Sequence, residues 1–111
     1  MNHTVFSPAI YNPSVVLAAT AATANVAVTG DNVGGTGAKL PVRITNAGPN
    51  AAFLNFGTTS AVTASTTTGM EILSGVSEVF LIPGSAGVAY VAAICAAAQT
   101  ASLSITPGAL N

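Results

Sequence analysis

Charge is what this sequence lacks most. Only five of its 111 residues are charged at neutral pH, namely Asp31, Lys39, Arg43, Glu71 and Glu78. Soluble domains normally cover their surface with about a quarter to a third charged residues. A surface of Ala, Thr, Ser, Gly and Asn hydrates more weakly, and copies of it repel one another very little. We therefore expect a protein that works while covered by neighbours in an ordered assembly.

Basic residues and long apolar runs are also scarce. Nucleic-acid binding needs several phosphate contacts from Lys or Arg, and the chain has two such residues. Hydrophobic residues make up 50% of the chain, but the longest apolar stretch, residues 88–98, is shorter than the roughly 20 residues of a membrane-spanning helix. A signal peptide is disfavoured, since no Lys or Arg precedes the Ala-rich residues 18–24. We expect no nucleic-acid partner and no membrane partner.

Residues that carry chemistry are few and scattered. Metal sites need clustered ligands, but the single His3 and the single Cys95 stand far apart. A triad of His3, Asp31 and a serine would place its base on a Pro-flanked terminal arm, and no nucleophile-elbow signature is present. Glu71 and Glu78 are better explained as surface or interface residues than as a glycosidase pair, because Trp is absent. We expect no enzymatic activity, no metal and no cofactor.

Two other features have plain structural explanations. A single cysteine excludes an internal disulfide, and Cys95 lies in an apolar segment where a buried, inert thiol is expected. The glycine-rich residues 31–37 are not followed by the Gly-Lys-Ser/Thr of a phosphate-binding loop or by a helical pattern. We predict an ordinary connecting loop there.

What the sequence does contain is the pattern of an all-β protein. Gly, Pro and Asn recur about every eight to twelve residues, the spacing of sandwiches and barrels. We predict a single antiparallel β-sandwich, jelly-roll-like, over residues 14–111. Residues 58–68 are ambiguous, and a helix is conceivable only at 92–98, where a strand is favoured. The predicted strands are residues 15–20, 25–29, 39–46, 52–57, 76–82, 88–95 and 101–106.

Alternation within these segments predicts which side chains face the core. In residues 39–46, Leu40, Val42 and Ile44 share one face. Pro41 cannot donate to a β-ladder, so this segment is predicted to be an edge strand or to begin at a bulge. In residues 101–106, the hydrophobic side chains Leu103 and Ile105 are predicted inward. Turns are predicted at residues 46–50 and, as a type II turn, at Pro83-Gly84.

Residues 76–82 can be oriented in two ways. Glu78 alternates with Phe80 and Ile82, and a carboxylate in the core would need a partner. We therefore expect Glu78 to face outward and Val79 and Leu81 to face the core. This orientation leaves Phe80 and Ile82 exposed to a neighbouring subunit.

Residues 1–13 are predicted to form an extended N-terminal arm. The segment contains Pro8 and Pro13 and lacks strand alternation. Because it cannot bury Phe6, Ile10 and Tyr11 within itself, we expect it to lie on a neighbouring subunit. A disordered tail and an arm folded over its own sandwich are the alternatives.

Lys39 and Arg43 are predicted to share the outward face of their strand, about 13 Å apart along it. Protection of the sheet edge is the favoured explanation, and pairing with carboxylates of a partner is the alternative. The candidate partner-interface residues from the sequence are Phe6, Ile10, Tyr11, Lys39, Arg43 and Phe80.

Several short segments resemble small virion proteins of tailed bacteriophages. In those proteins a strand ending in R-[IV]-x-N-x-G precedes a strand ending in F-G, as in residues 43–48 and 53–57 here. The family most similar is the capsid decoration (staple) proteins of epsilon-fifteen-like podophages. The resemblance covers residues 39–108 and continues through residues 69–73, 77–80, 90–94 and 103–108.

This resemblance implies a non-enzymatic structural protein on the outer surface of a virion. Such a protein would be made in the host cytoplasm, bind the major capsid protein, self-associate and clamp adjacent capsid subunits. A receptor- or glycan-binding module of a phage fibre or bacterial appendage is the alternative. Sugar recognition usually wants exposed aromatic rings, and the chain has no Trp and two Tyr. A self-assembling filament or surface-layer subunit is a third option.

Overall fold

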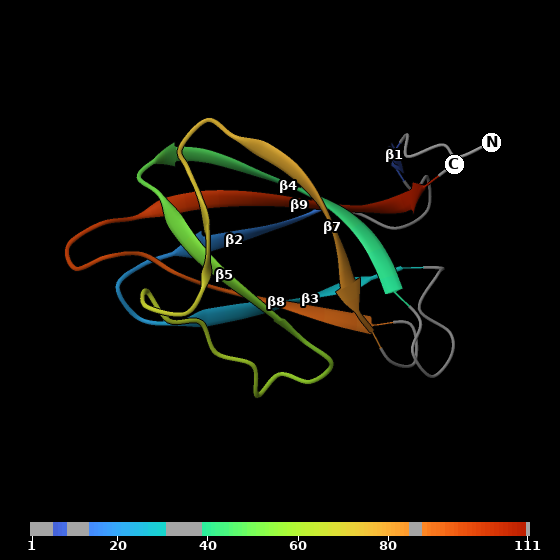
Figure 1. Cartoon of the computed structure of the whole chain (residues 1–111), viewed down its shortest axis with the longest axis horizontal. Coiled ribbons are helices and arrows are strands. Elements are labelled where there is room, and N and C mark those ends of the chain that lie inside the picture. Colours follow the sequence, from blue (N-terminus) through green and yellow to red (C-terminus); the bar gives the residue numbers. More distant parts are fainter. Residues whose placement is uncertain (1–5, 9–13, 31–38, 85–87, 111) are drawn as a thin grey trace.

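Two antiparallel sheets packed against each other make up the protein (Figure 1). The computed structural model describes residues 6–8, 14–30, 39–84 and 88–110. All regular secondary structure in these ranges is β, so the predicted β-sandwich is confirmed. Within the same ranges there is no helix long and apolar enough to cross a membrane. The strands are β1 (Phe6–Pro8), β2 (Val15–Ala19), β3 (Ala24–Thr29), β4 (Lys39–Pro49), β5 (Ala52–Gly57), β6 (Met70–Ile72), β7 (Ser77–Pro83), β8 (Val88–Ile94) and β9 (Ala101–Leu110).

The order of the strands is that of a jelly roll. One sheet runs β2-β9-β4-β7, and β1 pairs with the far end of β9 on the same side as β2. The other sheet runs β3-β8-β5-β6. From β2 onward, only the connection between β5 and β6 stays within one sheet. Eight strands that alternate between two sheets in this way enclose a hydrophobic core without forming a closed barrel.

The core lies between the sheets and is built from alternate residues of every long strand. Leu103 and Ile105 of β9 are fully buried, whereas Ser102 is exposed, which confirms the alternation predicted for this segment. The same alternation buries Leu40, Val42 and Ile44 of β4, as predicted. The other fully buried large side chains are Val28, Leu54, Ile72, Ile82 and Val91.

The predicted edge position of residues 39–46 is wrong. β4 lies inside its sheet, between β9 and β7. Pro41 is tolerated there because the pairing with β9 ends at Val42, opposite Pro107. The missing N–H of Pro41 therefore breaks no bond of that ladder. A proline is excluded only from positions whose N–H the sheet needs.

The predicted turn at residues 46–50 is displaced. β4 continues through Pro49 with an irregularity in its register after Asn46, and the chain turns at residues 50–51. Asn46 itself is fully buried and bonded through both its backbone and its amide. Elsewhere, residues 88–94 form a strand as favoured, and residues 58–68 contain no strand. The turn expected after Pro83 reaches residues 85–87, outside the described part of the chain.

The predicted orientation of residues 76–82 is also wrong. Ile82 is fully buried, and Phe80 is half-buried, with its ring centroid 5.4 Å from that of Phe56 on the opposite sheet. Val79 and Leu81 face outward and are 44% and 55% exposed. Glu78 shares the inner face with Phe80 but remains exposed, because this end of β7 lies at the rim of the sandwich. A carboxylate at the rim remains hydrated, so it can lie on the inner face of the strand without an ion-pair partner.

Candidate binding face

The two outer faces of the sandwich differ in how much of them the chain covers. On the four-stranded sheet, the connection between β5 and β6, residues 58–69, folds back over the strands. Asn25 and Asn55 flank the buried Ala92 in the sheet, one on each side. The amide of Asn25 donates to Ser60 O at 2.9 Å, and that of Asn55 donates to Thr63 O at 2.9 Å. This outer face is therefore occupied by the chain itself.

Two further contacts hold the same connection in place. The hydroxyl of Thr23 accepts a hydrogen bond from the N–H of Ala64 at 2.8 Å, and Ala64 is buried. Val62 packs so closely over Gly57 that a Cβ on the glycine would lie 2.9 Å from the Cβ of Val62. The four-stranded sheet thus has little surface left for a partner.

The outer face of the five-stranded sheet is different. Its centre consists of small hydroxyl side chains from three adjacent strands. Thr45 and Ser77 bond to each other at 2.8 Å between their oxygens, as do Ser14 and Thr106. Beside them, Val16 of β2 is 67% exposed. We call this surface the hydroxyl face, and it comprises Thr45, Ser77, Ser102, Ser104 and Thr106, with Val16 and Ala18 on one side and Val79 and Leu81 on the other.

The hydroxyl face is suited to contact with another protein surface. Its side chains are short, so they lose little conformational freedom when covered. Several hydroxyls already bond within the face, so a partner need not replace those bonds. Arg43, between Val79 and Thr106 in the register, is the charged side chain at its centre. Covering this surface removes few charges from water, which keeps the desolvation cost low.

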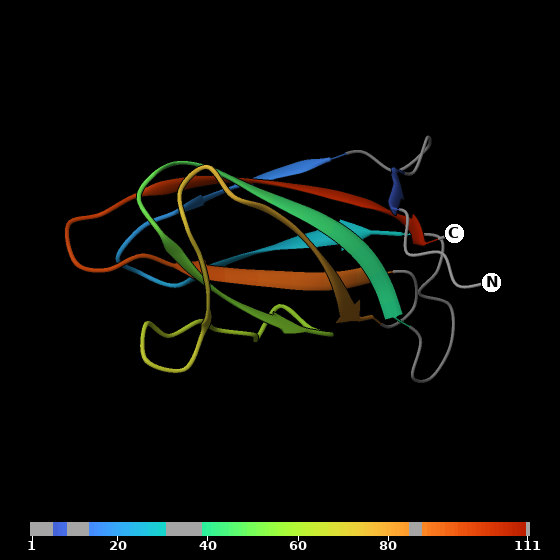
Figure 2. The same ribbon diagram turned by 45° about the horizontal axis from the view of Figure 1, so that its top comes forward.

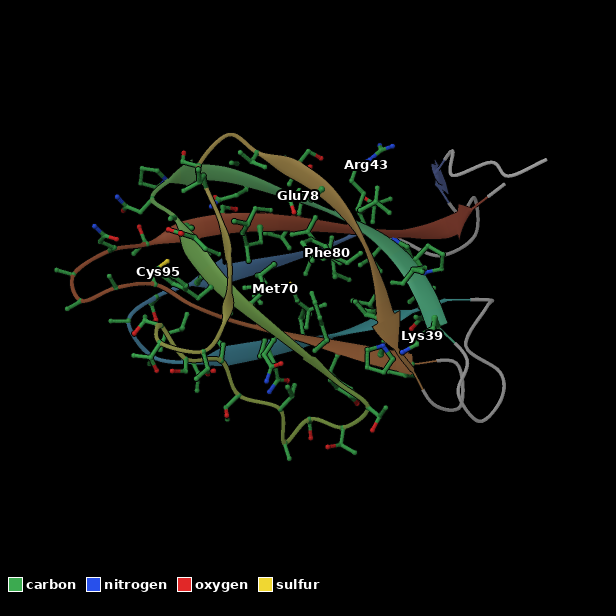
Figure 3. The ribbon with its side chains drawn as sticks, in the orientation of Figure 1. Lys39, Arg43, Met70, Glu78, Phe80 and Cys95 are labelled. Atoms are coloured by element: carbon green, nitrogen blue, oxygen red, sulfur yellow. The ribbon has the colours of Figure 1, made fainter. Side chains whose placement is uncertain are left out.

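Two of the predicted interface residues, Arg43 and Lys39 of β4, point outward from this sheet. Arg43 projects from the middle of β4 away from the space between the sheets, whereas Lys39 lies exposed at the beginning of the strand (Figure 3). The outward direction predicted for this pair agrees with the alternation along β4. The predicted role in edge protection does not fit, because β4 is an interior strand.

The other predicted interface residues are not gathered on the same surface. Phe80 points inward and packs against Phe56, so it is not presented to a neighbour as predicted. Phe6 lies in β1, whose backbone pairs antiparallel with residues 108–110 of the same chain. Ile10 and Tyr11 fall outside the described residues, as do His3, Asp31 and the glycine-rich loop.

The sequence analysis missed the exposed apolar residues of this face. Val79 and Leu81 were placed in the core because they alternate with a glutamate. Val16 was assigned to a strand without a direction. Its outward direction could have been inferred from the alternation within residues 15–19. Leu17 is larger than Val16 and is therefore the better core residue, so Val16 would face outward.

The described residues hold no cluster typical of a metal site. Within those ranges no three His, Cys, Asp or Glu side chains gather together. Glu71 lies on β6 and Glu78 on β7, in different sheets, and both are exposed, as expected for surface residues.

Cys95 is buried, as predicted. Its thiol points to the backbone oxygen of Ala19 at 3.8 Å, and burial raises the pKa of the thiol. The thiolate is the reactive form, so we expect a thiol reagent to label Cys95 only after unfolding. Because the pKa is raised in the folded state alone, this thiol stabilises the fold below the ordinary thiol pKa, and the contribution is lost as pH rises through the folded value. The rate of labelling with and without denaturant measures the protection of the thiol. Rapid labelling of the native protein would contradict the prediction.

Comparison with known proteins adds no relative. No model of a protein family matches the sequence, and no curated protein and no solved structure matches it.

Proposed function

We propose that this protein is a non-enzymatic structural component of a virion. In this proposal it binds the outer surface of an icosahedral capsid and stabilises the contacts between adjacent major capsid proteins. The observation that carries the proposal is the hydroxyl face. It is a weakly charged β surface that the described part of the chain leaves open, while the opposite sheet is covered by residues 58–69.

The physical properties of the hydroxyl face suit a protein that stabilises a capsid. A capsid is stabilised by any protein that binds the intact shell more tightly than its dissociated subunits. Many modest contacts by short side chains can cross a subunit boundary without stripping charged groups of water. Because few charges take part, binding should depend only weakly on salt concentration.

The architecture supports the proposal by analogy only. Jelly rolls are used by viral capsid proteins and also by lectins, so the fold permits both the proposed function and the glycan-binding alternative. Of the aromatic side chains that the structure describes, those of Phe53, Phe56, Phe80 and Tyr90, each is partly buried against the chain. Sugar recognition usually relies on rings presented to solvent, so these four rings favour capsid binding over glycan binding.

A matched pair of substitutions tests the proposal. Ala18 and Ala27 are both exposed alanines that point outward from a strand, one on the hydroxyl face and one on the opposite sheet. We expect Ala18→Arg to weaken binding to capsids at least about tenfold, which corresponds to about 1.4 kcal/mol. Ala27→Arg should bind like the unchanged protein. Co-sedimentation with capsids assembled without this protein measures both, and circular dichroism verifies the fold.

Other results would refute the proposal. A protein that is absent from purified particles of the virus encoding it, by quantitative mass spectrometry, is not a capsid cement. A copy number far below that of the major capsid protein would favour a fibre. Capsid binding that survives Ala18→Arg and is lost with Ala27→Arg would place the contact on the other sheet.

A further inference from the structure

β7 is an edge strand that can accept another strand. It pairs with β4 on one side, and among the described residues no strand pairs with its other side (Figure 1). It has seven residues, against three in β1, five in β2, six in β3 and three in β6, the other strands that end a sheet. Figure 2 shows β7 at the side of the sandwich away from β2 and β3. An edge of this length presents a row of backbone donors and acceptors.

The direction of those groups follows from the register with β4. Asn46 donates its backbone N–H to Val76 O at 2.9 Å and accepts from Gly75 N–H at 2.7 Å, so its backbone faces β7. Backbone direction alternates along an antiparallel strand, so Ile44 and Val42 also face β7. Their partners in β7, Glu78 and Phe80, therefore face β4. The backbone groups of the alternate residues Ser77, Val79, Leu81 and Pro83 point away from β4, toward the open edge.

The open edge is complementary to itself. Phe80 is the middle residue of Ser77–Pro83, so a second β7 turned by a twofold axis through Phe80 opposes the whole strand. Val79 of each copy then faces Leu81 of the other, and both residues have their N–H and C=O in the right direction. Ser77 faces Pro83, which has no N–H, so the end of the ladder loses only the bonds that a proline cannot make.

Side chains and charge favour the same arrangement. Val79 and Leu81 are 44% and 55% exposed in the single chain, and in this register they cover each other as two apolar cross-strand pairs. Glu78, the one charged residue of β7, faces Ile82 of the second copy rather than another Glu78. Edge strands are commonly protected by lysines, and β7 carries no lysine; its one charged residue, Glu78, is on the inner face at the rim.

We propose that β7 pairs antiparallel with β7 of a second copy of this chain about a twofold axis through Phe80. The two five-stranded sheets join into one continuous sheet. The axis is perpendicular to that sheet, so both hydroxyl faces lie on the same side. If the proposed capsid function also holds, one dimer presents a doubled face across a subunit boundary. The pairing itself does not depend on that function.

Charge substitutions at the cross-strand pairs test both the pairing and its register. The unchanged protein should sediment as a dimer in analytical ultracentrifugation over a concentration series. The double variant Val79→Lys with Leu81→Lys places like charges directly opposite each other twice, so its dissociation constant should rise at least about 100-fold. The double variant Val79→Glu with Leu81→Glu should also dissociate. A mixture of the two variants should restore dimers, because each lysine then faces a glutamate.

Val16→Lys is the control, since Val16 is exposed on the same face, more so than Val79 and Leu81, but lies on β2. It should leave the dimer intact. Circular dichroism distinguishes an unfolded variant from a folded monomer, and the rescue by mixing requires both variants to be folded. A protein that is monomeric throughout the series would overturn the proposal, and so would a dimer that survives the lysine pair. Neither measurement contains a capsid, so failure here leaves the test of the proposed function unaffected.

Discussion

Replacing Asn46 by aspartate is expected to lower the free energy of unfolding by at least about 3 kcal/mol. The amide of Asn46 donates to Asn50 O at 2.9 Å and to Ile72 O at 3.0 Å, and its Oδ1 accepts from Gly48 N–H at 2.7 Å. Aspartate keeps the acceptor but turns an oxygen toward two carbonyl oxygens. The side chain is fully buried, so water cannot replace the lost donors. Unfolding in urea, followed by circular dichroism, measures the loss.

The large effect follows from the position of Asn46 between two connections of the jelly roll. Its amide reaches the β4–β5 connection at Asn50 and the end of β6 at Ile72, while its backbone bonds to Gly75 and Val76 before β7. One residue therefore holds together segments that are far apart in the chain. Loss of its donors should also loosen the beginning of β7.

Asn55→Asp is the matched control for this substitution. The side chain of Asn55 is exposed and donates one hydrogen bond to a backbone oxygen, Thr63 O. Water can take over both groups when that bond is lost, so the cost should be about 1 kcal/mol or less. Equal losses in the two variants would show that Asn46 has no special role.

Truncation of Leu103 to alanine is expected to cost about 2–5 kcal/mol of unfolding free energy. Leu103 is fully buried in β9, opposite Leu17 of β2 on one side and Asn46 of β4 on the other. With strands paired on both sides, the surrounding backbone cannot easily collapse into the space left by the side chain. Domains of this size have a total stability of roughly 5–15 kcal/mol, so the variant loses a large part of it.

Ser102→Ala tests whether the effect comes from the core. Ser102 is the neighbouring residue in the same strand, but it is exposed on the hydroxyl face. We expect its free energy of unfolding to change by no more than the roughly 0.5 kcal/mol typical of surface substitutions. If Leu103→Ala is no worse than Ser102→Ala, the core described for this sandwich is wrong.

Much of the fold could be predicted from local patterns. Polar and apolar residues alternate unambiguously in residues 101–106 and 39–46, because Ser, Thr, Lys and Arg stand between the Leu, Val and Ile of the core. Spacing of Gly, Pro and Asn then separates the strands. The apolar surroundings of Cys95 were enough to predict its burial. These properties depend on neighbours in the sequence, so they can be inferred without a tertiary structure.

The candidate binding face could be predicted only in part. Arg43 and Lys39 were correctly placed on the outward side of their strand, whereas a surface covered by neighbours, expected from the scarcity of charge, stays a prediction. Which of the two sheets stays open could not be inferred, because residues 58–69 are held to the other sheet by hydrogen bonds that Asn25 and Asn55 donate and Thr23 accepts. Their oxygen and nitrogen partners are backbone atoms, which leave no pattern of residue types in the sequence.

By itself, the sequence determined the fold class, the low charge and the seven longer strands, whereas the three-residue strands β1 and β6 were not predicted. Only the tertiary structure decided the orientation of β7, since Val79 and Leu81 are as apolar as Phe80 and Ile82. Alternation shows that the two pairs face opposite ways, but not which pair meets the core. That choice is made by Phe56, which lies across the sandwich and packs against Phe80. The rim position leaves Glu78 in water, which removes the desolvation cost that had argued against this orientation.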